Sequence, residues 1–408
     1  MLRKRLTLVL WGGRDDEKYL KIKELLEQST RQFEVKYLWL DVSKKEKTLR
    51  TGIPIIDLQT VLKLGKDKTI DGVLLPVSST NSRESDNSVY GKERTLKENG
   101  FHGKIFVLPS MIERIPMQSL LMVDKKSILT LISKFSELYV AKFIIYEGCN
   151  INCAGCSHFA SICKKPHMLS IDEFEKDYRR LIKIFKYVPH IQFLGGEPLM
   201  NPELGGIITM AKRINPYVIL SIITNGLLLP KMDKAFFETL RENNVKVMVS
   251  YYKPLEKKID EIEKCLKDNK IRYVLSPCIE SFRIQYNLDG DKNSLDNYRK
   301  CKDYNCHTIV NGHIGGCYYA VTSKLANEYW GINIPEKYSY DLYSNRYSGA
   351  KLNRLLQTSS PLCSYCNTND IPSNKYKSFE AEQSPNVKLI PWHSVSDGVS
   401  KDDWFTYS

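Results

Sequence analysis

The chain has 408 residues, more than a single hydrophobic core usually serves, so two or three domains are expected. Hydrophobic residues make up 42% and charged residues 26%, a balance that excludes a disordered or fibrous protein. The net charge of +13 would suit a polyanionic partner, but the basic clusters at residues 44–47, 66–68 and 256–258 also contain acidic residues. We therefore expect a solvated surface and no nucleic-acid partner.

The amino terminus has basic residues followed by the apolar run Leu6–Trp11, but this run is too short for a secretory signal. No other stretch approaches the apolar length that a membrane span needs, so a soluble, cytoplasmic protein is expected. In a reducing compartment the 11 cysteines suit metal or cluster ligation better than disulfides.

Residues 1–124 alternate apolar runs with charged segments, which predicts a small parallel, Rossmann-like α/β domain. The expected strands are residues 6–11, 35–40, 70–77 and 104–108, with a helix over residues 15–28. Gly12, Gly13 and Asp41 resemble parts of a dinucleotide-binding turn, but the full glycine motif is absent. A plain turn and strand end explain these residues equally well. Residues 78–88 are polar and predict a loop.

Residues 125–286 show repeated strand and helix patterns after a helix-like link through Tyr139. The predicted strands are residues 142–146, 191–194, 218–223, 245–250 and 271–275; the predicted helices are residues 170–187, 202–214, 231–243 and 258–268. Ser170 and Glu173 form a capping-box pattern at the first helix. Such units predict a parallel sheet or partial barrel with chemistry at the carboxyl ends of its strands.

Three cysteines, Cys149, Cys153 and Cys156, follow the first of these strands in one short loop. Three thiolates can each bind one iron of a cubane and leave the fourth iron without a protein ligand. An open coordination position of this kind is typical of a reactive site, whereas structural sites are usually closed by four protein ligands. A zinc knuckle completed by His158 or Cys163 is the structural alternative.

Two further segments stand at the ends of the next two strands. Gly195, Gly196, Glu197 and Pro198 end one strand, and the segment 224–226 with Asn225 ends the other. Glycines at a strand end let the backbone approach a ligand closely, and a glutamate offers a carboxylate to a cationic amine. Tight turns with a solvated acid are the alternative for either segment alone.

Together these motifs resemble the radical S-adenosylmethionine (SAM) superfamily over residues 142–275. The resemblance implies a partial (β/α)6 barrel in which Cys149, Cys153 and Cys156 hold a [4Fe-4S] cluster that binds SAM. It also implies that residues 195–198 meet the methionine end, that Asn225 and Ser250 contact the ribose, and that ferredoxin or flavodoxin supplies the electron. Gly155 departs from the family, where an aromatic residue often precedes the last cysteine.

Residues 287–370 contain a second set of cysteines: Cys301, Cys306, Cys317, Cys363 and Cys366. Five thiols suffice for a four-ligand site. This set resembles the auxiliary-cluster extensions called SPASM or twitch domains, which implies a second [4Fe-4S] cluster; a structural zinc is the alternative. Whether Cys301 or Cys306 is the fourth ligand stays open. Beyond residue 286 we expect little regular structure, and over residues 371–408 an irregular arm anchored by Trp392 and Trp404.

The runs 153–159, 195–199 and 224–230 also resemble a subgroup associated with surface-polysaccharide biosynthesis. This resemblance implies a sugar, nucleotide-sugar or glycan substrate that is oxidised, epimerised or deoxygenated by a 5′-deoxyadenosyl radical. Peptide modification is the alternative reaction. A non-catalytic iron–sulfur or zinc binding protein is the alternative from another class of protein.

Overall fold

A computed structural model describes residues 5–12, 22–24, 26–27, 33–40, 53–76, 88–109, 130–151, 153, 156–279, 281–282, 290–301, 303, 306–331, 333–366 and 374–375. The chain forms two compact units, Met1–Glu137 and Leu138–Ser408. All eleven cysteines are free thiols.

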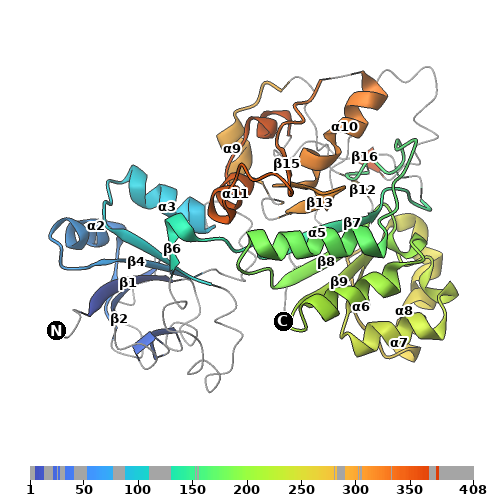
Figure 1. Ribbon diagram of the computed structural model, residues 1–408, viewed down its shortest axis with the longest axis horizontal. Helices are drawn as coiled ribbons and strands as arrows, with labels where there is room; N and C mark the ends of the chain where they lie inside the picture. Colours follow the sequence, from blue (N-terminus) through green and yellow to red (C-terminus); the bar gives the residue numbers. More distant parts are fainter. Residues whose placement is uncertain are drawn as a thin grey trace. The chain divides into compact units, whose positions relative to one another are not determined.

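The first unit is built on a six-stranded sheet with the order β3-β2-β1-β4-β5-β6 (Figure 1). Neighbouring strands are parallel except that β6 runs antiparallel to β5. The strands are β1 Leu6–Gly12, β2 Phe33–Leu40, β3 Ile55–Ile56, β4 Gly72–Pro76, β5 Lys104–Leu108 and β6 Thr130–Leu131. The four strands predicted for this region are therefore confirmed, and β3 and β6 are additional short edge strands.

Two capped helices accompany this sheet: α2 Leu58–Lys66 begins after Asp57, and α3 Val89–Glu98 begins after Ser88. Each cap side chain accepts a backbone hydrogen bond from the first turn, as N-cap residues do. Residues 22–24 and 26–27 are helical, in agreement with the predicted helix over 15–28. Gly13, Asp41 and residues 78–87, which carry the other predictions for this unit, lie outside the described residues.

The second unit has an eight-stranded sheet with the order β11-β10-β9-β8-β7-β13-β14-β15. The strands from β11 to β13 in this order are parallel, and β14 and β15 extend the edge antiparallel. Their bounds are β7 Val140–Tyr146, β8 His190–Gly195, β9 Ile219–Thr224, β10 Lys246–Val249, β11 Arg272–Leu275, β13 Thr308–Val310, β14 His313–Gly315 and β15 Ser339–Asp341. The five strands predicted here are confirmed, and the α/β class with them.

Four helices cover one face of this sheet (Figure 1). They are α5 Ile171–Ile184, α6 Leu204–Ile214, α7 Lys234–Glu242 and α8 Ile259–Asp268. The core takes alternate strand residues, for example Ala141 and Phe143 of β7, because successive side chains of a strand point to opposite faces. Both hydrogen bonds of the predicted capping box at Ser170 are present. The 3-10 turns η4 Pro198–Met200, η5 Leu229–Lys231 and η6 Lys253–Lys258 follow β8, β9 and β10.

Regular structure continues beyond residue 286, so the expectation of an irregular segment there is wrong. Besides β13, β14 and β15, the elements there are α9 Ser294–Arg299, α10 Tyr318–Trp330, α11 Gly349–Leu356, η7 Pro361–Tyr365 and β16 Asn374–Lys375. The short strand β12 Ser281–Phe282, which precedes residue 286, pairs with β16. The helix α10 lacks a clean apolar stripe because Thr322 and Ser323 are buried beside its apolar residues. The apolar residues of α10 therefore show no helical periodicity in the sequence, and the helix was not predicted.

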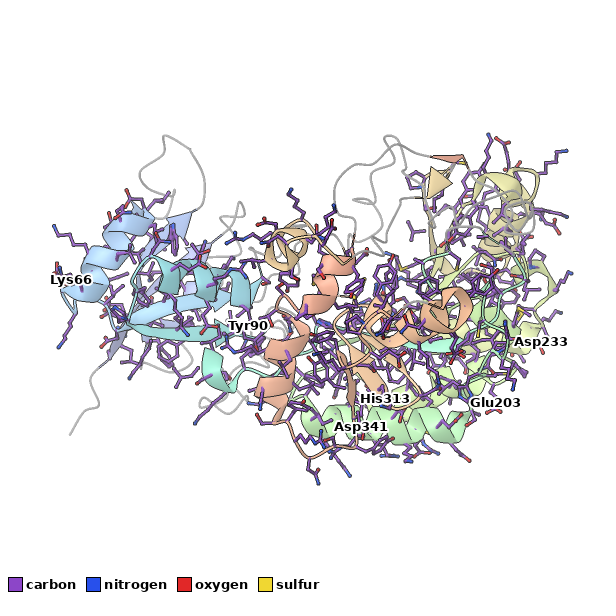
Figure 2. The ribbon with its side chains drawn as sticks, turned by 90° about the horizontal axis from the view of Figure 1, so that it is seen from above. Lys66, Tyr90, Glu203, Asp233, His313 and Asp341 are labelled. Atoms are coloured by element: carbon purple, nitrogen blue, oxygen red, sulfur yellow. The ribbon has the colours of Figure 1, made fainter. Side chains whose placement is uncertain are left out.

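The edge strands are tied to α5 by Asp177. Its carboxylate accepts a hydrogen bond from the backbone N–H of Gly312 at 3.1 Å and another from the hydroxyl of Tyr343. His313 and Asp341, paired between β14 and β15, lie together beside this helix (Figure 2). The edge strands β14 and β15 are thus tied into the fold of the second unit.

The prediction of a helix-like link through Tyr139 is also wrong. The described part of this segment contains the strand β6 and the 3-10 turn η3 Ile132–Lys134. Pairing of β6 with β5 draws this segment into the first unit, so the units divide later than residue 124. Within the described residues, no helix is long and apolar enough to cross a membrane. Trp392, Trp404 and most of the predicted arm lie outside the described residues.

Candidate functional site

The first cysteine loop leaves the sheet at the end of β7 and returns beside it. The backbone N–H of Leu169 donates to the carbonyl of Ile145 at 3.0 Å, and the N–H of Glu147 donates to the carbonyl of His167 at 3.0 Å. The Glu147 carboxylate also accepts from the His167 N–H at 2.9 Å. These bonds close residues 147–167 into an excursion whose two ends are fixed to the strand.

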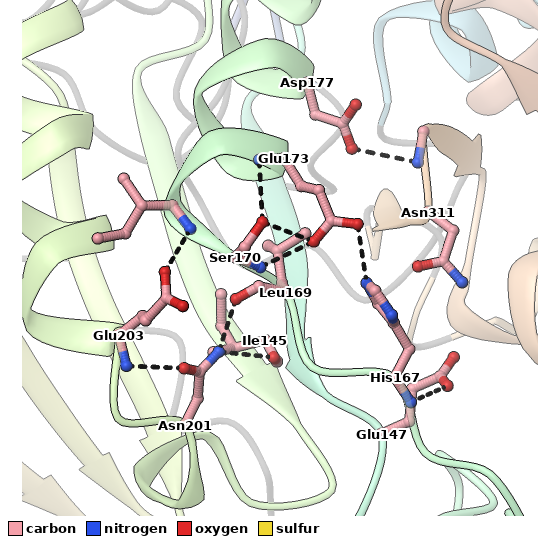
Figure 3. Close-up of polar contacts among 12 residues, drawn as sticks. Ile145, Glu147, His167, Leu169, Ser170, Glu173, Asp177, Asn201, Glu203 and Asn311 are labelled. Carbon is pink, nitrogen blue, oxygen red and sulfur yellow. Dashed lines mark hydrogen bonds and ion pairs between the residues drawn. The ribbon is translucent and has the colours of Figure 1, made fainter.

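Asn201 holds both ends of this excursion at once (Figure 3). Its amide donates to the carbonyls of Ile145 at 3.1 Å and Leu169 at 2.8 Å, and its Oδ1 accepts from the N–H of Glu203 at 2.8 Å. The side chain is 1% exposed. Because a buried amide must satisfy its donors and acceptor, Asn201 fixes the base of the loop. Asn201 was not predicted from the sequence, although it lies only a few residues beyond Pro198.

The three cysteines of the loop interact electrostatically with Tyr252. Burial raises the pKa of Cys149 to about 12 and also raises the pKa of Cys156. Burial likewise raises the pKa of Tyr252, and negative charge on Cys153, Cys156 or Cys149 raises it further. Tyr252 follows β10 and was not predicted from the sequence. Thiols this buried lose their protons most readily to a metal, because metal binding and deprotonation are coupled.

The zinc alternative needed His158 or Cys163 as an additional ligand. The ring of His158 packs against that of Tyr318 with centroids 5.1 Å apart, and the thiol of Cys163 donates to the Glu147 carboxylate at 3.9 Å. Among the described residues, no three His, Cys, Asp or Glu side chains are arranged to hold a single metal ion.

The glycine pair lies where the cysteine loop packs against the end of β8. The N–H of Gly196 donates to the carbonyl of Tyr146 at 2.8 Å, and the N–H of Glu197 donates to the carbonyl of Gly148 at 2.9 Å. A Cβ on Gly195, whose φ is +152°, would lie 2.2 Å from the Tyr146 carbonyl oxygen. A Cβ on Gly196 would lie 2.1 Å from that of Gly148. The glycines therefore admit the backbone of the cysteine loop.

Glu197 connects the end of β8 with the end of β9. It is fully buried, and its carboxylate accepts from the hydroxyl of Thr224 at 2.6 Å and from the N–H groups of Leu199 at 3.0 Å and Asn225 at 2.8 Å. Burial raises the pKa of Glu197 to about 7 despite these hydrogen bonds. Pro198 starts the 3-10 turn that Glu197 caps. The carboxylate is not the solvated acid of the alternative interpretation.

Asn225 completes the connection to the cysteine loop. Its amide nitrogen lies 2.7 Å from Oδ1 of Asn150 and 3.8 Å from Sγ of Cys149, and its side chain is buried. The N–H of Ser250, the other predicted ribose contact, donates to the carbonyl of Thr224 at 2.8 Å. The structure thus brings the segments predicted after β7, β8, β9 and β10 together at one edge of the sheet.

The second set of cysteines is assembled from separate elements. Cys301 follows α9, Cys306 precedes β13, Cys317 is the N-cap residue of α10, and Cys363 and Cys366 lie in and just after η7. Within this set, burial is the main cause that raises the pKa of the Cys317 thiol to about 12, and nearby Cys363 and Cys306 add to it. Burial also raises the pKa of Cys301 and of Cys366, and both are further raised by Cys317.

Asn297 of α9 fixes the turn that carries two of these cysteines. Its amide donates to the carbonyls of Cys363 at 2.8 Å and Cys366 at 2.6 Å. The side chain is 7% exposed. Because two backbone carbonyls depend on one amide group, the turn and α9 are held as one piece.

An aromatic cluster lies between the two sets of cysteines. Besides the contact of Tyr318 with His158, the ring centroids of Phe159 and Tyr319 lie 6.3 Å apart. The apolar cluster around these rings includes cysteines of both sets: Cys156, Cys306, Cys317 and Cys366. The two sets therefore share one packed region of the fold.

Comparison with known proteins identifies the region that carries these motifs. Residues 143–317 match the family model of the Radical SAM superfamily. The chain is 26% identical over 156 residues to a GTP 3′,8-cyclase of Clostridium acetobutylicum, over 34% of this chain and 48% of that protein. It is 27% identical over 107 residues to a 7,8-dihydro-6-hydroxymethylpterin dimethyltransferase of Methanocaldococcus jannaschii, over 26% of this chain and 21% of that protein. The chain thus spans less than half the length of these curated relatives.

Among solved structures, BtrN in complex with AdoMet and 2-DOIA is 18% identical, with a TM-score of 0.40 over 58% of this chain and 96% of that one. The anSMEcpe structure with AdoMet and a peptide is also 18% identical, with a TM-score of 0.28 over 35% of this chain and 44% of that one. Residues 143–317 are thus a radical SAM domain by the family match, which spans less than half of the chain.

Proposed function

We propose that this radical SAM enzyme binds a [4Fe-4S] cluster through Cys149, Cys153 and Cys156 and attacks a C–H bond of a sugar, nucleotide-sugar or glycan. The observation that carries the proposal is the chain of contacts from the Glu197 carboxylate to the Asn225 backbone and from the Asn225 side chain to Cys149. It joins the three sequence motifs at the carboxyl ends of parallel strands, where α/β enzymes place their chemistry.

The residues around the loop fit an iron–sulfur cluster with SAM. The donor set of three thiols, of which Cys153 is buried and the other two are half-buried, suits iron. Glu197 is a buried carboxylate whose charge a cationic amine would balance. When bound, the cluster and SAM supply a 5′-deoxyadenosyl radical that removes a hydrogen atom. The chain's own part is to hold the sulfurs at fixed positions, to orient the methionine end against residues 195–198 and to exclude water. Asn225 and Ser250 are the proposed ribose contacts.

Tyr252 is a further residue of this proposed site. Its hydroxyl is electrostatically coupled to all three cysteines, and it follows β10 as Ser250 does. Since Gly155 provides no aromatic ring, we propose Tyr252 as an aromatic contact of SAM. Its phenol offers both a ring face and a hydrogen-bonding group.

The sugar-type substrate is supported by the face of the sheet opposite the four helices. Lys142, Gln192 and Ser221 lie there in register on β7, β8 and β9, and all three are at least nine-tenths buried. A polar face of this kind suits a ligand with many hydroxyl groups better than an apolar ligand. The parallel strand order of the first unit also suits a nucleotide-binding domain more than a peptide-binding one.

We further propose that the six parallel strands form a partial (β/α)6 barrel and that the first unit is Rossmann-like. The cysteines of residues 301–366 would hold a second [4Fe-4S] cluster in a twitch or SPASM-like extension, ferredoxin or flavodoxin would donate the electron, and the protein would work in the cytoplasm. These points rest on the strand order, on the buried thiols and on the free state of all eleven cysteines.

The test is anaerobic reconstitution with iron and sulfide, followed by chromatographic assay for 5′-deoxyadenosine after addition of SAM and dithionite. The proposed enzyme forms 5′-deoxyadenosine, and the variant with all three loop cysteines changed to Ala forms none. A non-catalytic iron–sulfur or zinc protein forms none in either case. Deuterated nucleotide-sugars and peptides are then compared: deuterium in 5′-deoxyadenosine from a sugar supports the substrate class, and transfer only from a peptide overturns it.

A further inference from the structure

Tyrosine and basic side chains gather where the helix α5 meets the edge strand β15 and the segment that leads from β15 into α11. We call this group the tyrosine strip; its members are Lys176, Arg180, Tyr340, Tyr343, Tyr347 and Lys351. Tyr343 is 38% exposed, and Lys176 and Lys351 are exposed as well. No step of the proposed reaction uses these residues.

Contacts with the segment after β15 hold the basic side chains of α5 in place. The guanidinium of Arg180 donates to the carbonyl of Leu342 at 2.6 Å and to Oδ1 of Asn345 at 3.3 Å. Nζ of Lys176 lies 4.7 Å from the ring centroid of Tyr343. A cation over an aromatic ring is attracted by it, so Lys176 is positioned without a carboxylate partner.

The other end of the strip is built in the same way. Nζ of Lys351 lies 5.3 Å from the ring centroid of Tyr347, and the rings of Tyr347 and Tyr340 pack edge to face with centroids 5.5 Å apart. Tyr340 pairs with Ile314, whose side chain belongs to the core beneath the helices. Tyr340 therefore lies on the same side of the sheet as α5.

The cations of the strip make no ion pair with a carboxylate among the residues that the structure describes. Elsewhere on α5, by contrast, Arg179 pairs with Glu175 at 2.7 Å. Two carboxylates beside the strip serve the fold: Asp177 is buried and accepts from the hydroxyl of Tyr343, and Asp341 accepts from the backbone N–H of the same residue at 2.8 Å. The strip therefore keeps a positive charge that suits an anionic ligand.

The strip begins at the edge of the sheet where the proposed reaction site lies. β15 runs in the same direction as β7, because β13 is parallel to β7 and two antiparallel pairings follow it. Asp341 at the end of β15 is therefore at the edge where the parallel strands end, and Tyr343 follows it. Three strand spacings, roughly 14 Å, separate β15 from β7. A ligand that reaches from one to the other must consist of several linked units.

An acidic carbohydrate fits this surface better than a nucleic acid does. Base stacking needs open ring faces, but lysines lie over the rings of Tyr343 and Tyr347. The phenol hydroxyls can exchange hydrogen bonds with sugar hydroxyls. Ammonium and guanidinium groups without a carboxylate partner suit the carboxylates of acidic sugars.

We propose that the tyrosine strip binds an acidic oligosaccharide, as the part of a glycan substrate that extends beyond the reacting sugar. The inference rests on the proposed function and narrows its substrate from sugars in general to an acidic glycan chain. Binding at the strip requires neither a cluster nor SAM, so it can be measured on the metal-free protein.

The test measures binding of a fluorescently labelled oligogalacturonate to the full, metal-free chain. Lys176→Met combined with Lys351→Met weakens this binding by about tenfold, because two contacts between opposite charges are lost. Lys176→Arg combined with Lys351→Arg keeps both charges and retains most of the binding. A neutral galactan oligosaccharide of the same length binds the original chain about tenfold more weakly than the acidic one.

Lys234→Met combined with Lys270→Met is the matched control. Both lysines are exposed, one at the start of α7 and the other after α8, and their substitution removes the same charge from the chain. This variant binds oligogalacturonate as the original chain does. An equal loss in the two double Met variants would assign the binding to net charge alone and overturn the inference.

Failure of this inference is distinct from failure of the proposed function. Tighter binding of single-stranded DNA than of oligogalacturonate, lost in the variant of Lys176 and Lys351, overturns the inference. If deuterium is transferred from a sugar while that variant binds oligogalacturonate as the original chain does, only the inference fails. Transfer only from a peptide overturns the proposed substrate and the inference with it.

Discussion

The two sets of cysteines are built in opposite ways. Cys149, Cys153 and Cys156 lie in one loop whose ends are fixed to β7 by local hydrogen bonds and by Asn201. The second set is drawn from residues 301–366 and depends on Asn297 and on the contact between Lys142 and Cys306. A site carried by one loop is visible in a sequence, whereas a site assembled from distant elements becomes definite only when the chain folds. Substitutions that act on one set alone test this difference.

The largest expected effect comes from Cys153→Ala. Loss of one of three proposed cluster ligands should reduce 5′-deoxyadenosine formation to the level of a protein-free control, because no other thiol of the loop replaces it. The second set should keep its iron. Cys163→Ala is the control, since its thiol bonds to Glu147 instead, and it should retain activity. Equal losses of 5′-deoxyadenosine formation in both variants would contradict the assignment of Cys153, and not Cys163, as a ligand. Loss of iron from the second set in Cys153→Ala would contradict the independence of the two sets.

Gly196→Ala should be the next most damaging change. Its Cβ would lie 2.1 Å from the Gly148 carbonyl oxygen, so the cysteine loop must shift away from β8. We expect unfolding free energy to fall by about 3 kcal/mol and 5′-deoxyadenosine formation to fall by at least about tenfold. Gly205→Ala in α6 is the matched control, because the nearest atom to its Cβ is 4.0 Å away. That substitution should preserve activity and raise helix stability slightly.

Asn297→Ala should act on the second set. It removes the donor of two hydrogen bonds to the carbonyls of Cys363 and Cys366, at an expected cost of about 1 to 3 kcal/mol in unfolding free energy. When Asn297→Ala is added to the variant with all three loop cysteines changed to Ala, the amount of bound iron should fall. When Asn297→Ala is the only substitution, the loop site should keep its cluster. Asn345→Ala, at an exposed asparagine, is the control and should leave both sites intact. Unchanged iron in Asn297→Ala would show that the turn forms without this clamp.

The smallest effect concerns pH. The pKa of Glu197 is raised by burial to about 7 from 4.5, so the folded chain binds its proton more tightly than the unfolded chain. Stability from this group is therefore fully present below about pH 4.5 and is lost as pH rises through 7, at up to about 1.4 kcal/mol per pH unit. Glu197→Gln should flatten the melting temperature of the metal-free protein over this interval.

The control for this pH series is Glu256→Gln, at an exposed carboxylate paired with Lys253. It should leave the pH profile of the original chain unchanged. A profile for Glu197→Gln that still falls between pH 5 and 7 would assign the proton to another group.

Much of the second unit's fold was predictable because its signals are local. The capping box at Ser170 and Glu173 placed the start of α5, and the apolar runs placed the parallel strands. The helix α10 escaped prediction because it is buried on several sides and shows no amphipathic stripe. The short strand β6 escaped because its pairing with β5 overrides the weak preference of its own residues.

The candidate site divides in the same way. The residues of the cysteine loop and of segments 195–198 and 224–226 were found from the sequence, because each motif follows a strand and parallel strands end at one edge. Asn201, Tyr252, Asn297 and Lys142 were not, because an asparagine, tyrosine or lysine has no pattern of its own that marks a buried partner. Their roles depend on which backbone or sulfur atoms the fold brings within hydrogen-bonding distance.

Local patterns were enough to predict the α/β class, the order of the parallel strands along the chain and the loop with three cysteines, because these follow from periodicity and from residues close together in the chain. The burial of Glu197 against the end of β9 and the contact of Lys142 with Cys306 could be recognised only in the folded chain. The physical reason is burial: removing a carboxylate or an ammonium group from water makes its few remaining contacts decisive, and those contacts exist only in the folded chain.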